Sequence, residues 1–218
     1  MDMDDEPIIT MRAEQVALGP LRRDLVPDYT RWINDLAVAR GLGPIRGPVT
    51  YEAELTWFER AVADDAATHF TIYAPASRAT DEPVHDPSSG APDPPGLAWL
   101  PIGTTALEGI DWRNRTAEFG IMLGGAGARG RGYGTETTRL MLDYAFTALG
   151  LHSVMLRVHE YNLAGAAAYR RAGFRELGRR REAHWMGGKF WDTIYMECLA
   201  DEFASPYLAR LFAPDPPR

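Results

Sequence analysis

The segment Arg129-Gly-Arg-Gly-Tyr-Gly-Thr135 lies between an apolar run that predicts a strand and a periodic run that predicts a helix. Its three glycines leave the backbone free to turn so that successive N–H groups converge on one point. The first turn of the following helix adds partial positive charge there, and Arg129 and Arg131 add formal charge. The segment therefore predicts a mixed α/β domain with a binding site for a pyrophosphate.

Two common phosphate-binding patterns do not fit this turn. The Walker A loop requires a lysine directly after its last glycine, and no lysine has that spacing here. The dinucleotide fingerprint requires G-x-G-x-x-G, whereas this turn has G-x-G-x-G with Thr135 where the last glycine belongs. A solvated turn without any ligand is a third interpretation, and the glycines alone do not separate it from a phosphate site.

Hydrophobic periodicity on both sides of the turn predicts the other elements. The expected strands are 15–21, 68–74, 99–110, 115–123, 153–158, 174–186 and 190–199. The expected helices start at Asp24, at Thr50, at Thr135 and after Asn162, and the last of them ends before Gly173. This order of elements predicts a single mixed α/β domain.

Composition divides the chain into three expected parts. Residues 1–14 are expected to be a flexible acidic leader, residues 15–200 the domain, and residues 201–218 a C-terminal tail. Within the domain, the Pro-, Asp-, Ser- and Gly-rich stretch 75–98 is expected to be a flexible insertion, because it has too little apolar surface to order itself.

Charge and cysteine content exclude several classes of protein. The net charge of −7 argues against non-specific binding of nucleic acid, and no run of about 18 apolar residues predicts a membrane span. The single cysteine, Cys198, excludes an internal disulfide and a Cys-cluster metal site, and the acidic N-terminus is unlike a signal peptide. We therefore expect a soluble, cytoplasmic protein without a metal. Residues 111–218 carry 15 basic and 12 acidic side chains, which suits a phosphate-bearing ligand.

Two motifs together resemble one superfamily. Arg129-x-x-Gly132-x-Gly134 is similar to the pyrophosphate loop of the GCN5-related N-acetyltransferases (GNAT), and Asn162, Tyr169 and Gly173-Phe174 follow its second signature. The hairpin Gly188–Tyr195 and the opening Leu18–Asp24 are similar to the ribosomal-protein N-terminal acetyltransferase branch and its polyamine-acetylating relatives. The resemblance covers about residues 15–200, and the 75–98 insertion departs from it. It implies a single-domain GNAT fold of the α/β (α+β) class, with about seven strands in a mixed sheet and about four helices.

The resemblance also implies acetyl-CoA as co-substrate and a set of site residues. Glu118 is implied as the base, directly or through water, and Tyr169 as the acid for the departing thiolate. A backbone N–H near Met122 is implied as the oxyanion donor. The implied cofactor-binding residues are Ile121, Met122, Leu123, Arg129, Gly130, Arg131, Gly132, Tyr133, Gly134, Thr135, Asn162, Gly165 and Tyr169.

Other roles for the same residues stay open. Asn162 can be only a helix cap, Tyr169 a core aromatic, and Glu118 a solvent-facing carboxylate. Cys198 is expected to be a small buried hydrophobe. The acceptor implied is a primary amine on a protein N-terminus, a polyamine, or a small metabolite or antibiotic. The alternative is a non-catalytic CoA-binding sensor or interaction module, and a homodimer is compatible with the tryptophan-rich hairpin.

Overall fold

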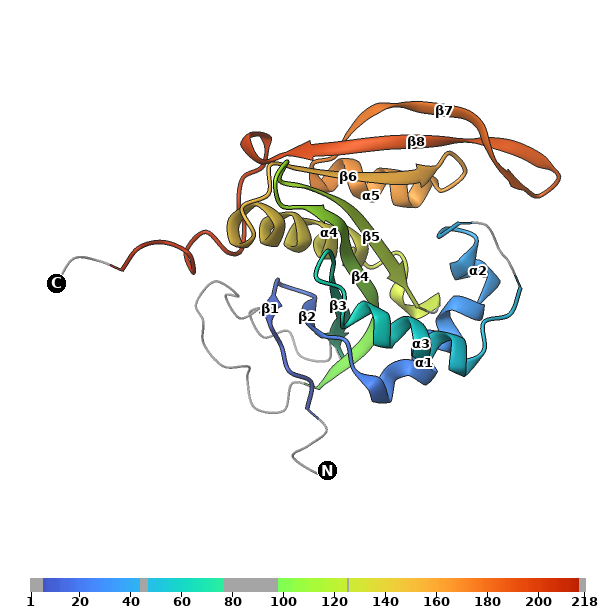
Figure 1. The fold of residues 1–218 in the computed structure, drawn as a ribbon, viewed down its shortest axis with the longest axis horizontal. Helices are drawn as coiled ribbons and strands as arrows, with labels where there is room; N and C mark the ends of the chain where they lie inside the picture. The colour runs from blue at the N-terminus through green and yellow to red at the C-terminus, as the bar shows by residue number, and fades with distance from the viewer. Residues whose placement is uncertain (1–5, 44–46, 77–97, 125, 216–218) are drawn as a thin grey trace.

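Eight strands pair into one mixed sheet in the computed structural model, which describes residues 6–43, 47–76, 98–124 and 126–215 (Figure 1). The strands are β1 Met11–Arg12, β2 Ala17–Pro20, β3 Thr68–Pro75, β4 Trp99–Asp111, β5 Thr116–Leu123, β6 Ser153–His159, β7 Arg175–Met186 and β8 Lys189–Leu199. The helices are α1 Val26–Asn34, α2 Leu36–Ala39, α3 Tyr51–Ala61, α4 Tyr133–Asp143 and α5 Leu163–Ala172. Short helical turns are η1 Arg23–Leu25, η3 Ala126–Ala128, η4 Tyr144–Ala148, which is a π-turn, and η5 Ala200–Glu202.

The sheet has the order β1-β2-β3-β4-β5-β6-β8-β7, and β5 with β6 is its one parallel pair among the described residues. That parallel pairing covers only Thr116–Glu118 against Ser153–Met155. Beyond it, β5 stays paired with β4 as far as Leu123, while β6 stays paired with β8 as far as His159. The two halves of the sheet therefore separate after Glu118, and a wedge-shaped opening lies between β5 and β6.

The mixed α/β class is confirmed, with eight strands and five helices where about seven and four were expected. The additional strand, β1, lies inside the segment expected to be a leader. Its residue Met11 pairs with Leu18 and is buried. The paired sheet therefore begins at Met11, before the expected start of the domain at residue 15, and a two-residue strand has no periodicity that a sequence can show.

Of two residues expected to cap a helix, one does so and the other does not. Thr50 caps α3 as expected, since its side chain accepts a hydrogen bond from the Ala53 amide. Asp24 does not cap α1, because the chain first makes the turn η1 and Asp24 pairs with Arg22. Proline at position 27 sets the first turn of α1 instead.

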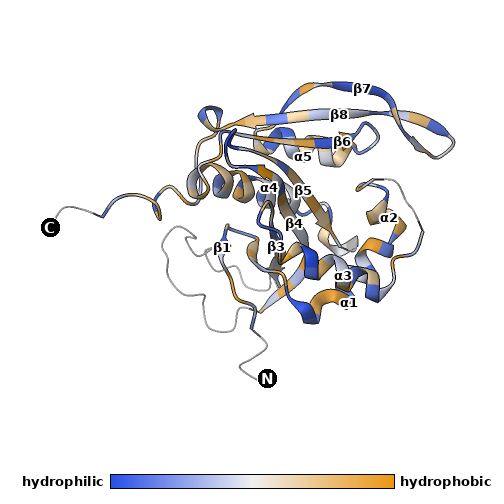
Figure 2. Cartoon of the chain, viewed as in Figure 1, coloured by the Kyte–Doolittle hydropathy of each residue, from blue (hydrophilic) through white to orange (hydrophobic). Residues whose placement is uncertain are grey.

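Hydrophobic side chains pack on both faces of the sheet. Ala117 and Phe119 of β5 join the main core, which contains residues of α4 and α5, whereas Met122 packs with Tyr29, Trp32 and other residues of the α1–α3 layer. Figure 2 shows β6 as mainly hydrophobic and the edge strand β7 as mainly hydrophilic. The wedge between β5 and β6 is thus bounded by one helical layer on each face.

The 75–98 insertion is bounded by paired backbone. Ala76 donates a hydrogen bond to the Ala98 carbonyl at 2.8 Å, so β3 and β4 stay together up to residues 76 and 98. The rest of the insertion, residues 77–97, lies outside the described residues.

The C-terminal segment is tied to the domain by one buried carboxylate. Asp143 at the end of α4 is fully buried and accepts four hydrogen bonds, from the Thr147 and Ser205 hydroxyls and from the Tyr207 and Leu208 amides. Leu208 is buried in the main core. The segment expected as a tail from residue 201 therefore belongs to the packed domain as far as Leu208.

We predict that Asp143→Ala lowers the free energy of unfolding by about 3 kcal/mol, because it leaves buried donors without an acceptor. Urea denaturation followed by circular dichroism measures the change. Asp215→Ala, in an exposed part of the same segment, is the matched control and should change stability by less than about 0.5 kcal/mol. Equal stability of the two variants would contradict the anchoring role of Asp143.

Candidate functional site

The glycine-rich turn at the start of α4 has the backbone conformation of an anion site. Gly130 and Gly132 have φ values of +74° and +88°, which side chains rarely tolerate. Gly132 is the N-cap of α4, and no side chain caps the helix there. The first amides of α4 are therefore available, and the helix dipole favours negative charge at the same point.

The edge of β5 that faces the wedge is the second part of the site. The Gly124 amide donates to the Ile102 carbonyl of β4, at 2.7 Å, and this bond fixes which residues of β5 turn toward β4. By the alternation of an antiparallel pair, the Met122 amide points toward β4, and those of Ile121 and Leu123 point toward the wedge. The amides next to Met122, and not the Met122 amide itself, are therefore oriented toward a ligand in the wedge.

Asn162 positions the start of α5, the third part of the site. Its Oδ1 accepts a hydrogen bond from the Gly165 amide at 3.0 Å, which is the expected N-cap. A Cβ on Gly165 would lie only 2.7 Å from the Asn162 Nδ2, so glycine is required for this cap to close. The cap and a ligand contact are compatible, because Asn162 also lines the cavity described below.

Tyr169 lies about two turns along α5 from Asn162. Its ring packs edge-on against Phe119 and Phe174, with centroid distances of 6.1 and 6.2 Å. Burial raises the pKa of its hydroxyl to about 12, so the phenol stays protonated at neutral pH. Its hydroxyl makes no hydrogen bond to the residues that the structure describes. Tyr169 is therefore both a core aromatic and a donor with no partner of its own.

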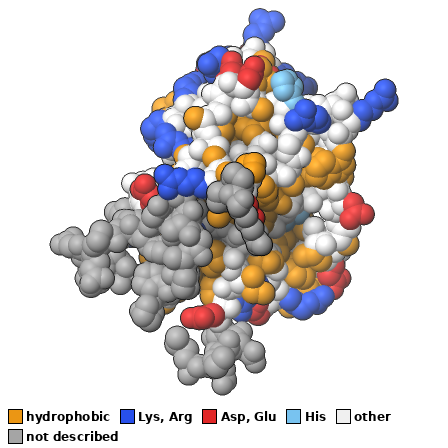
Figure 3. All heavy atoms as spheres, turned by 90° about the vertical axis from the view of Figure 1, so that its left-hand side faces the viewer, with side chains coloured by type: hydrophobic (Ala, Val, Ile, Leu, Met, Phe, Trp, Pro, Cys, Tyr) orange, Lys and Arg blue, Asp and Glu red, His pale blue; other side chains and the backbone are white. Residues whose placement is uncertain are grey.

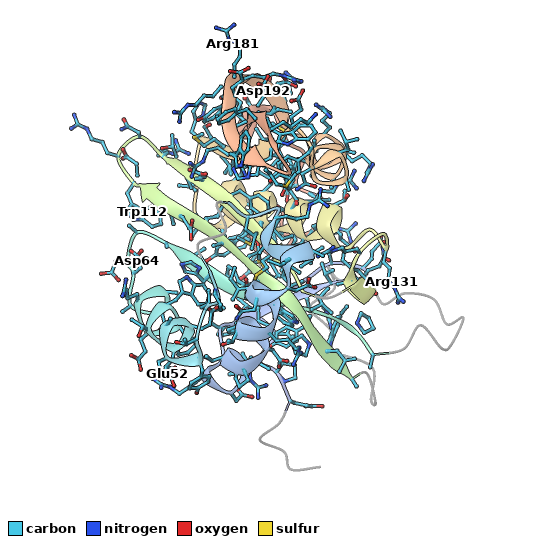
Figure 4. The ribbon with its side chains drawn as sticks, turned by 90° about the vertical axis from the view of Figure 1, so that its right-hand side faces the viewer. Glu52, Asp64, Trp112, Arg131, Arg181 and Asp192 are labelled. Carbon is cyan, nitrogen blue, oxygen red and sulfur yellow. The ribbon has the colours of Figure 1, made fainter. Side chains whose placement is uncertain are left out.

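These parts enclose one cavity of about 530 Å³. It is lined by every residue expected to bind the cofactor except Arg131: Ile121, Met122, Leu123, Arg129, Gly130, Gly132, Tyr133, Gly134, Thr135, Asn162, Gly165 and Tyr169. Arg131 is exposed at the outer side of the loop before α4 (Figure 4). The fold thus brings together residues that lie up to about 50 positions apart in the sequence.

Sequence reasoning missed one wall of the cavity. Tyr161 and Arg171 line it as well, together with five residues of α2 and the chain after it: Ala37, Val38, Arg40, Gly41 and Leu42. The stretch Gly41–Pro44 looked only like a helix break. The hydrogen bond from the Tyr161 hydroxyl to the Arg40 carbonyl holds this wall against the start of α5, and no local pattern predicts a contact between residues 121 positions apart.

Glu118 lies at the point where the wedge begins and is not part of the cavity lining. Its carboxylate accepts a hydrogen bond from the Nε of Arg157 at 2.6 Å, and its side chain is 33% exposed. This contact raises the pKa of the Arg157 guanidinium. Arg157 was not expected as a site residue, although strand alternation places it on the same face of β6 as Met155, the parallel partner of Glu118.

Other chemistries find little support in the described part of the chain. No three His, Cys, Asp or Glu side chains there lie close enough together to hold a metal ion. Cys198 is fully buried as expected, and burial raises the pKa of its thiol to about 11. No helix within 6–43, 47–76, 98–124 or 126–215 is long and apolar enough to cross a bilayer.

Comparison with known proteins identifies a family and the same fold. The acetyltransferase (GNAT) domain family matches residues 15–175. Spermidine N(1)-acetyltransferase of Vibrio cholerae is 31% identical over 102 residues, which is 47% of this chain and 58% of that protein. The putative ribosomal N-acetyltransferase YdaF of Bacillus subtilis is 31% identical over 101 residues, 46% of this chain and 55% of that protein. These alignments span little more than half the length of the curated relatives.

Solved structures match over most of the chain. Spermidine N-acetyltransferase from Vibrio cholerae in complex with CoA and spermine superposes with a TM-score of 0.69 at 21% identity, covering 87% of this chain and 98% of that one. A dodecameric structure of spermidine N-acetyltransferase from the same organism has a TM-score of 0.65 at 23% identity, covering 91% and 99%. At this identity the superpositions establish the fold, and the family match covers well over half of the sequence. The chain belongs to the acetyltransferase (GNAT) domain family.

Proposed function

We propose that the chain transfers an acetyl group from acetyl-CoA to a primary amine. The observation that carries this proposal is the cavity of about 530 Å³ beside β5, because the glycine turn, the edge of β5 and Tyr169 all contribute to it. The spermidine acetyltransferases and the putative ribosomal acetyltransferase among its relatives support the same reaction class.

The cavity residues fit the parts of acetyl-CoA. The positive φ values of Gly130 and Gly132 leave room for a diphosphate against the first amides of α4, with Arg129 at the rim. Ile121 and Leu123 offer backbone groups to a pantetheine arm, which would lie along β5 as an added strand does. Asn162 and Gly165 border the arm from the α5 side.

Each remaining group has a defined task in the reaction. Bound acetyl-CoA supplies a thioester carbonyl as the electrophile. The amine nitrogen forms a bond to this carbonyl carbon and the C–S bond breaks, while an amide of the β5 edge donates to the oxygen. Glu118 takes the proton of the ammonium, directly or through water. Tyr169 donates a hydrogen bond to the departing sulfur, since a phenol with a pKa of about 12 holds its own proton more tightly than a thiol does.

A thiol-release assay over a panel of amines tests the proposal. Free CoA should appear only when acetyl-CoA and an amine are both present. Binding of CoA without release of thiol for any amine would favour the non-catalytic sensor.

We predict that Gly132→Asp weakens CoA binding at least about tenfold in calorimetry, because a carboxylate replaces empty space beside the diphosphate. Gly109→Asp is the matched control, since Gly109 also has a positive φ of +57° and open space around it. It lies near the β4–β5 turn and does not line the cavity. If both variants fold and bind CoA as the wild type does, the diphosphate lies elsewhere.

We further propose a cytoplasmic location and self-association. The single, buried cysteine supports a reducing compartment. Trp112 and Trp185 are exposed on the surface, which supports a homodimer. Light scattering of the purified chain measures the oligomeric state, and a monomer at all concentrations would contradict the proposed self-association.

A further inference from the structure

A second cavity, of about 540 Å³, adjoins the first and shares Arg40 and Tyr161 with it. Its walls come from the end of α2, the turn between β6 and α5, and the tip of the β7–β8 hairpin. The lining residues are Arg40, Glu160, Tyr161, Leu163, Met186, Lys189, Phe190 and Trp191. Figure 1 shows the hairpin tip and α2 at the same end of the molecule.

The unpaired charges in this second cavity are positive. Glu160 is engaged, because its carboxylate pairs with Arg179 at 3.4 Å and accepts from the Asp192 amide at 3.4 Å. Arg40 and Lys189 have no carboxylate partner among the described residues. The Arg40 guanidinium lies 5.5 Å from the centre of the Tyr161 ring, and the Lys189 ammonium 3.6 Å from that of Trp191.

The β7–β8 hairpin carries further charges of both signs. Arg180, Arg181 and Glu182 are exposed on β7, and Figure 4 shows Arg181 and Asp192 at the top of the molecule. Asp192 is engaged through its Oδ1, which accepts from the Glu182 amide at 2.9 Å. Figure 3 views the molecule from the side away from the hairpin tip and shows Lys and Arg side chains on the upper part of that face as well. The second cavity itself, in which Arg40 and Lys189 have no carboxylate partner among the described residues, favours an anionic partner over a cationic one.

The position of this cavity along the sheet fixes its distance from the reacting amine. Glu118 is level with Met155, and Glu160 follows Met155 by five positions along β6 and its turn. At about 3.3 Å per strand residue, the cavity begins about 16 Å from Glu118. An extended peptide with its amine at Glu118 would reach it with about its fifth and sixth residues. Leu163 and Phe190, 76% and 56% exposed, form an open rim through which a longer chain can continue.

We propose that the acceptor is the amino terminus of a polypeptide with acidic side chains at about its fifth and sixth residues, which bind Arg40 and Lys189. The inference rests on the proposed acetyl transfer and narrows it to one class of acceptor. A polyamine of comparable length would instead place an ammonium group beside these two cations, where like charges repel. This chain should therefore differ in acceptor from the spermidine acetyltransferases that it resembles.

Acetylation kinetics of matched peptides test the inference. Three peptides share a sequence and a free N-terminus and carry Asp, Asn or Lys at residues five and six, and spermidine is the fourth acceptor. We expect kcat/KM for the Asp peptide to exceed that for the Lys peptide at least about tenfold at low salt, and the ratio to shrink as salt rises. The doubly substituted variant Arg40→Glu with Lys189→Glu should reverse the order. Arg60→Glu, an exposed change at the end of α3, should leave the order as in the wild type.

Each outcome bears on one of the two proposals. Equal kcat/KM for the three peptides, or a faster reaction with spermidine than with any of them, would overturn the acidic-peptide acceptor while leaving acetyl transfer intact. An unchanged preference in the charge-reversed variant, with the variant shown to be folded by circular dichroism, would do the same. Failure to acetylate any amine, peptide or spermidine, would instead reject the proposed function.

Discussion

Replacement of Tyr169 by phenylalanine is expected to reduce kcat about 10²–10³-fold while leaving CoA affinity within about twofold. The ring keeps its packing against Phe119 and Phe174, so only the hydroxyl is lost. Tyr169 lines the cavity and its hydroxyl has no partner in the described structure, so the task expected of the hydroxyl is to donate to the leaving sulfur. Single-turnover kinetics, which isolate the chemical step, measure the change.

A control variant and the pH dependence of the wild-type rate test the same role of Tyr169. Tyr144→Phe removes a hydroxyl from a tyrosine that packs on Phe70 at 5.4 Å, away from the cavity, and should leave kcat unchanged. Because the active form of Tyr169 is protonated and its pKa is raised to about 12, the wild-type rate should not fall as the pH rises through 10. A decrease in kcat of less than about threefold for Tyr169→Phe would show that the role of Tyr169 is purely structural.

Replacement of Glu118 by glutamine is expected to reduce kcat about 10²-fold at neutral pH. An alkylammonium with a pKa near 10 is almost wholly protonated there, and only the free amine attacks the thioester. Glutamine still accepts a hydrogen bond from Arg157, so the geometry at the start of the wedge should persist. The rate should partly recover at high pH, because free amine then forms in solution. The pH–rate profile of the variant measures this shift.

The control for Glu118 is Glu197→Gln on the neighbouring strand β8, opposite Met155, which should keep the wild-type profile. If Glu118→Gln also keeps that profile, the base is another group, and Glu108 on β4, directly opposite Glu118, would be tested next. Loss of CoA binding in Glu118→Gln would show that the carboxylate is structural.

The sequence predicts those parts of the fold and site that depend on local constraints. Gly132 is required by its φ of +88°, and Asn162 by the cap that it forms with Gly165, so both motifs are visible in the sequence. Long strands such as β4 and β5 are visible through alternation of their side chains. These local features were enough to predict the mixed α/β class, and the family resemblance that the two motifs carry implied most of the residues that line the first cavity.

The remaining features depend on contacts between distant residues. Neither the bond from Tyr161 to Arg40 nor the pair of Arg157 with Glu118 follows from any spacing along the chain. The same is true of Asp143, whose sequence position at the end of a helix does not indicate that it holds residues 205–208. The geometry of the acceptor side is therefore known only from the folded chain.

We expect the cavity beside β5 to serve acetyl transfer to an amine. Mass spectrometry of an amine and peptide library incubated with the chain and acetyl-CoA tests this role most directly. One added acetyl group should appear on primary amines in step with release of CoA, and no product should appear with Tyr169→Phe over the same interval. Unmodified amines throughout, with CoA bound to a folded chain, would contradict this role.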